Sequence, residues 1–219
     1  MLMTPGVRKL ALTAHVTSSV GWLGAVAAFL ALAIAGLSSE DSQLVRAAYL
    51  TMELTGWFVI VPLSIASLLT GLVQSLGTTW GLFRHYWVVA KLVISVLATV
   101  ILLVHMQPIG HMADVVRAAT LARGEMGGLR IQLIADAGAA VLVLLIATAL
   151  SVYKPRGLTA FGRAAQEAMS PETGGLAVGR LQATGRPRWV TVSYAVVVLL
   201  VALFVIRHLA SGGMGNHGP

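Results

Sequence analysis

The chain has 219 residues, of which 57% are hydrophobic and 11% are charged, and it contains no cysteine. A chain of this length cannot bury so many apolar side chains from water, which excludes a soluble globular protein. Without cysteine, the chain has no disulfides, thiolate ligands, c-type haem attachment or iron–sulfur clusters. The formal charge of +7 requires no nucleic-acid partner, because cations beside apolar segments orient a protein in its membrane.

Long apolar stretches follow one another along the chain, and each approaches or exceeds the roughly 20 residues that span a bilayer as a helix. Uninterrupted apolar runs without two-residue alternation favour helices over a transmembrane barrel. The sequence predicts an all-α, multi-pass protein of the plasma membrane, with one domain over residues 1–210. Its five predicted transmembrane helices cover residues 10–36, 54–76, 86–106, 131–153 and 189–208.

The connecting segments are more polar and carry different predictions. Proline at position 62 should kink the second helix, because it removes a backbone hydrogen bond. Residues 107–130 suit a short interfacial helix. Residues 154–188 are predicted to form a mostly irregular loop with a short helix near 160–168. Residues 211–219 are predicted to form a disordered tail.

The distribution of cations predicts the orientation. Arg8, Lys9 and Arg84 precede the first and third helices, and the basic segment 154–188 follows the fourth. These positions share one side of the membrane. The positive-inside rule therefore predicts a cytoplasmic amino terminus, a cytoplasmic loop at 154–188 and a carboxyl terminus outside.

Ionisable residues within the predicted helices fall into two layers by depth. The inner layer contains His15 and Lys91. The outer layer contains Glu53, His105, Asp136 and His208, with His111 in the adjoining loop. A charge in the apolar span costs a few kcal/mol, so such residues often mark a site. Structural alternatives are pairing of Asp136 with Arg130 or another helix, and extension of Lys91 to the inner headgroups.

Helical spacing relates these residues further. His15 and Trp22 are seven residues apart and lie on one side of the first helix. Lys91 and His105 are fourteen residues apart and lie on one side of the third helix. A neutral imidazole can bind the iron of haem or a copper ion, and Glu53 or Asp136 could orient His105. We expect Lys91, Asp136 and Glu53 to support chemistry, and Trp22 to contact a cofactor.

Copper is the alternative metal. The pairs His105-Met106 and His111-Met112 repeat at the predicted outer boundary. Imidazole together with thioether suits Cu(I), so the copper alternative uses His105, Met106, His111 and Met112. With haem and copper taken together, the candidate metal-binding histidines are His15, His105 and His111.

The segment His15-Val-Thr-Ser-Ser-Val-Gly-Trp22-Leu-Gly24 resembles the opening helix of small bacterial membrane proteins of the CopD copper-resistance domain and HemJ-type protoporphyrinogen oxidase group. The aromatic residues before Lys91 resemble the same group, and the resemblance covers about the first 110 residues. It implies b-type haem and porphyrinogen oxidation, with His15 and Lys91 as the residues concerned.

Three functions follow as hypotheses. The first is a membrane protein that binds haem b and has a redox or electron-transfer role, with His15 and His105 as axial ligands and Lys91 beside a propionate. Because these histidines lie at opposite depths, they belong to separate haems or only one of them binds haem. The second is copper binding or transport, and the third is a structural accessory subunit. Expected partners are membrane lipid and either a redox partner or further copies of the chain.

Overall fold

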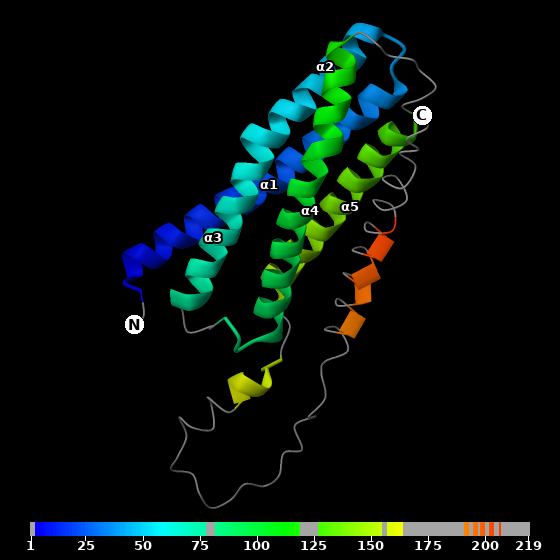
Figure 1. Ribbon diagram of the computed structural model, residues 1–219. Helices are drawn as coiled ribbons and strands as arrows, with labels where there is room; N and C mark the ends of the chain where they lie inside the picture. Colours follow the sequence, from blue (N-terminus) through cyan, green and yellow to red (C-terminus); the bar gives the residue numbers. More distant parts are fainter. Residues whose placement is uncertain are drawn as a thin grey trace, which may run out of the picture.

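A computed structural model describes residues 3–77, 82–118, 127–154 and 157–163, together with residues 191–192, 195–196, 198–199, 202–203 and 206. Most of these residues are helical, and none of them belongs to a β-strand (Figure 1). The helices are α1 (Pro5–Ser38), α2 (Ser42–Thr55), the π-helical segment η1 (Gly56–Ile60), α3 (Val61–Gly77), α4 (Tyr86–Arg117) and α5 (Gly127–Tyr153).

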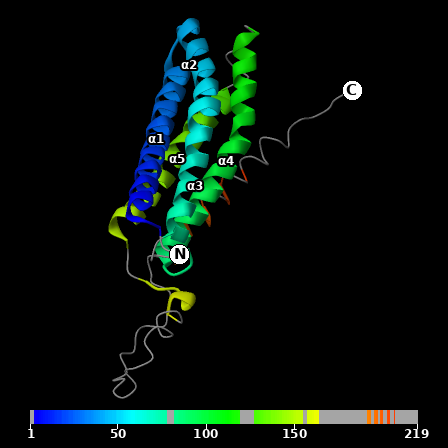
Figure 2. The same ribbon diagram turned by 90° about the vertical axis from the view of Figure 1, so that its left-hand side faces the viewer.

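The helices lie roughly side by side and form an elongated bundle (Figures 1 and 2). In the described part, four helices are long and apolar enough to cross a bilayer: Pro5–Ser38, the continuous rod Ser42–Gly77, Tyr86–Arg117 and Gly127–Tyr153. The prediction of an all-helical, multi-pass bundle is confirmed for these helices. Most of the predicted fifth helix lies outside the described residues, and it stays a prediction together with the orientation of the termini.

All four helices extend beyond the predicted apolar runs. The second begins at Ser42, where the Asp41 carboxylate accepts a hydrogen bond from the Gln43 backbone N–H at 2.8 Å. The third continues through Pro108 to Arg117, so residues 107–117, predicted as part of a separate interfacial helix, belong to α4. Apolar runs mark only the segment inside the bilayer, whereas backbone hydrogen bonding continues into polar sequence.

The second rod contains the irregularity expected from its proline. Pro62 lacks an N–H, and its ring crowds the carbonyl one turn earlier. The structure accommodates this by the π-helical turn η1, in which the Val61 N–H bonds to the Gly56 carbonyl five residues back. The extra residue in this turn rotates the face of α2 relative to that of α3.

Apolar side chains lie both inside the bundle and on its outside. Trp22, Phe29 and Met52 are at most 4% exposed and form part of the core. On the outside, Phe58 is 75% exposed and Leu142 is 59% exposed, although both lie within apolar spans. Exposed apolar side chains in the middle of long helices indicate lipid contact, which agrees with a membrane location.

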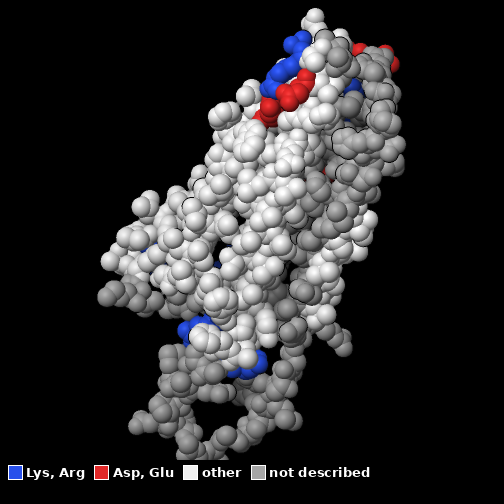
Figure 3. All heavy atoms as spheres, viewed as in Figure 1, with Lys and Arg blue, Asp and Glu red and all other residues white. Residues whose placement is uncertain are grey.

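The two ends of the bundle differ in charge (Figure 3). At one end, the chain start contacts the end of α3 through Met3 N–H and Gly77 carbonyl (3.3 Å), and the Thr159 N–H donates to the Arg84 carbonyl (3.0 Å). We call this the basic end, since its described charged residues are Arg8, Lys9, Arg84, Lys154 and Arg163. The other, mixed-charge end holds Glu40, Asp41, Glu53 and Asp114 together with Arg46, Arg117 and Arg130.

Candidate functional site

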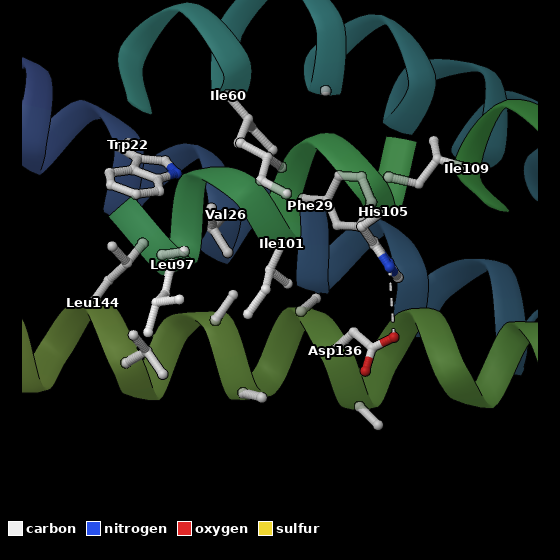
Figure 4. Close-up of a pocket in the computed structure, with 18 of the residues that line it drawn as sticks. Trp22, Val26, Phe29, Ile60, Leu97, Ile101, His105, Ile109, Asp136 and Leu144 are labelled. Atoms are coloured by element: carbon white, nitrogen blue, oxygen red, sulfur yellow. Dashed lines mark ion pairs between the residues drawn. The ribbon is translucent and has the colours of Figure 1, made fainter. Parts of the chain in front are cut away.

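An apolar cavity of about 350 Å³ lies between α1, η1, α4 and α5. Cavities of this size accommodate small molecules or parts of cofactors. Figure 4 shows that the labelled side chains of these helices converge on it. Its lining includes Trp22, Val26, Phe29, Ile60, Ile101 and Leu144. Leu203, from the segment predicted as the fifth helix, also contributes.

Two ionisable side chains line this cavity, and they point toward each other at one side of it (Figure 4). His105 projects from α4 and Asp136 from α5, with 3.6 Å between His105 Nδ1 and Asp136 Oδ2. Their side chains are only 10% and 14% exposed. The separation is longer than a hydrogen bond but within ion-pair range. Asp136 therefore favours a proton on Nδ1 of His105, which directs the lone pair to Nε2.

The aromatic wall of the cavity comes from α1. Trp22 and Phe29 are each 4% exposed and lie seven residues apart, so both face the cavity from one side of the helix. The sequence predicts a cofactor contact for Trp22, and the structure places it in the cavity wall. Phe29 was missed, although the same seven-residue spacing from Trp22 identifies it.

The η1 segment contributes Gly56 and Ile60 to the wall of the cavity. A Cβ on Gly56 would lie 2.7 Å from Met106 Cε, so the Met106 side chain packs directly over this glycine and joins η1 to α4. Hydropathy gives no signal for a π-helical turn, so the sequence did not identify these two lining residues.

His15 lies in a different polar environment, between α1 and α3. Its Nδ1 is 3.0 Å from the Ser67 carbonyl oxygen and 3.2 Å from Thr70 Oγ1. A carbonyl can only accept, so Nδ1 carries the proton and Nε2 keeps its lone pair. A Cβ on Gly71 would lie 2.9 Å from His15 Cε1, which shows how closely α3 covers the imidazole.

Lys91 is among the charged groups near enough to act electrostatically on His15, which agrees with a shared inner layer. Among the described residues, Lys91 has no carboxylate within ion-pair distance. His105 follows Lys91 on α4 by fourteen residues, or roughly 21 Å of helical rise. The structure therefore does not bring His15 and His105 together.

Glu53 and His111 lie away from the cavity. The Glu53 carboxylate accepts a hydrogen bond from Arg117, which also donates to Asp114 at 2.7 Å. Glu53 is thus tied to the end of α4, and Asp136 is the carboxylate beside His105. His111 is exposed on α4, whereas Met106 and Met112 are buried. Within the described ranges, no three His, Asp or Glu side chains gather as a metal cluster.

In comparisons with known proteins, no family model, no curated protein and no solved structure matches this chain.

Proposed function

We propose that this membrane protein holds a b-type haem in the apolar cavity, where His105 would bind the iron, and that the protein has a redox role. The observation that carries the proposal is the position of His105. Its imidazole lies in an apolar cavity inside a membrane bundle, with a carboxylate facing Nδ1. Metal-binding histidines are typically oriented in this way, by an acceptor at the other ring nitrogen.

The donor set fits haem iron, which is commonly held by a histidine nitrogen. Bound haem would supply one-electron redox chemistry that the side chains of this chain lack. Asp136 would fix the tautomer and direction of His105, and its negative charge would stabilise the oxidised state of a metal at Nε2. Trp22, Phe29 and Ile101 would exclude water from the cavity.

A second histidine has a similar local arrangement. His15 donates from Nδ1 to the Ser67 carbonyl, so its Nε2 is in the ligating form, and Lys91 supplies a positive charge nearby. The roughly 21 Å of rise between Lys91 and His105 makes this a separate site. The resemblance of the His15–Gly24 segment to haem-associated membrane proteins supports a ligand role for His15.

The test is the visible absorption spectrum of detergent-purified protein from haem-replete cells. We expect a Soret band in the wild type and a smaller haem-to-protein ratio in His105→Ala. The matched control is His111→Ala, since His111 lies on the same helix but is exposed. A colourless wild type, or equal haem content in both variants, would contradict the assignment.

Asp136→Asn tests how the carboxylate acts. The substitution keeps the size of the side chain but removes its charge, so we expect haem to remain and its reduction potential to rise. The potential is measured by redox titration of the absorption spectrum. An unchanged potential would show that Asp136 serves only helix packing.

A further inference from the structure

Arg130 is a buried cation that forms no ion pair with any residue that the structure describes. It lies in the first turn of α5, is 9% exposed, and its Cζ is 5.7 Å from the centroid of the Tyr49 ring. Its Nε is buried without a hydrogen-bond acceptor, and no carboxylate among the described residues lies within ion-pair distance of the guanidinium. The predicted partner, Asp136, faces His105 instead.

The side chain of Arg130 lines a second cavity, at the mixed-charge end. This cavity also measures about 350 Å³, and its other lining residues are Leu37, Ser38, Ser39, Glu40 and Gly127. It therefore lies between the end of α1 and the start of α5. A Cβ on Gly127 or Gly128 would meet no atom within 4 Å, so there is open space around the first turn of α5.

Two parts of this cavity, the start of α5 and the Arg130 guanidinium, attract an anion. A helix start carries a partial positive charge, and its first N–H groups have no partner within the helix. Arginine offers five N–H donors in a planar arrangement that matches the oxygens of a phosphate group. A desolvated guanidinium without an anion is costly, whereas one bound to an oxyanion is stable. The Ser39 Oγ accepts from the Asp41 N–H (3.1 Å), which leaves its own proton available for donation.

We propose that this cavity binds a phosphate group through Arg130, the first turn of α5 and the Ser39 hydroxyl. The phosphate belongs either to a phospholipid headgroup, since the cavity lies at the end of the membrane-spanning helices, or to a free anion. Glu40 also lines the cavity and repels doubly charged anions more than singly charged ones. The singly charged phosphodiester of a lipid therefore fits better than inorganic phosphate.

The first experiment measures phosphorus per protein after extensive washing in mild detergent. We expect the wild type to retain about one phospholipid more than Arg130→Gln. The matched control is Arg46→Gln, which removes the same charge from an exposed position at the same end. The control should retain as much lipid as the wild type. Arg130→Lys keeps the charge without the planar donors, and its retention should be intermediate.

The second experiment separates the two sources of phosphate. If the ligand is a free anion, inorganic phosphate should raise the unfolding temperature of delipidated wild type but not of Arg130→Gln, and Glu40→Gln should strengthen the effect. If the ligand is a lipid, the wild type should retain more phosphorus than Arg130→Gln, and inorganic phosphate should have little effect on the unfolding temperature of the delipidated wild type. A wild type that neither retains phosphorus nor responds to phosphate overturns the proposal, as does equal behaviour of Arg130→Gln and Arg46→Gln in both measurements.

Discussion

At the scale of single residues, the Tyr49 hydroxyl is a buried polar group without a hydrogen-bond partner. Tyr49 is 1% exposed and its ring packs against Gly36 and Arg130. Removing an unpaired hydroxyl relieves a desolvation penalty, so Tyr49→Phe should raise the free energy of unfolding by about 1 kcal/mol. Thermal unfolding in detergent measures this, with Tyr153→Phe (82% exposed) as the control. Destabilisation by Tyr49→Phe would reveal a partner for the hydroxyl.

Gly71 gives a second prediction at this scale, because its missing side chain makes room for His15. Gly71→Ala would place a methyl group 2.9 Å from His15 Cε1 and displace the imidazole from the Ser67 carbonyl. Overpacking of this kind costs about 1–3 kcal/mol. On α5, Gly138→Ala meets nothing within 4 Å, and better helix propensity should make it neutral or stabilising. Equal thermal stability of both variants would show that His15 has room to move.

At the scale of elements, η1 connects a backbone irregularity to the shape of the His105 cavity. Pro62 explains the π-helical turn, and Gly56 and Ile60 of that turn line the cavity. Pro62→Ala permits regular α-helix and should rotate these two residues away from their present positions. We expect a lower haem-to-protein ratio without loss of thermal stability. Ala66→Gly on the same rod, a destabilising control, should lower stability without a comparable loss of haem.

Helix existence was predictable from the sequence, but helix length and local geometry were not. Hydropathy identified the apolar segments of all four described spans, since lipid imposes that requirement directly. It missed Ser42–Glu53 because this part of the rod is polar, although a capping residue, Asp41, marks its start. In the site, depth along the helices placed His15 near Lys91, whereas depth alone could not determine that Asp136 rather than Glu53 faces His105. That choice depends on the rotation of each helix about its axis.

At the scale of the whole molecule, the asymmetry of charge predicts how the protein lies in its membrane. Within the described residues, the basic end has five cations, Arg8, Lys9, Arg84, Lys154 and Arg163, and no carboxylate. At the mixed-charge end, Arg117 forms ion pairs with both Glu53 and Asp114, which neutralise its charge. Because Lys and Arg beside transmembrane helices are retained on the cytoplasmic side, and the described residues place five of them at the basic end against three at the other, the basic end should face the cytoplasm.

The natural absence of cysteine makes this orientation directly measurable. Ser42→Cys introduces a thiol at the start of α2 on the mixed-charge end, and Lys154→Cys introduces one after α5 on the basic end; both positions are exposed. A membrane-impermeant maleimide applied to intact cells should label Ser42→Cys, and should label Lys154→Cys only after permeabilisation. The wild type provides the unlabelled background. The reverse labelling pattern would place the basic end outside the cell. The mixed-charge end, with the phosphate cavity beside Arg130, would then face the cytoplasm.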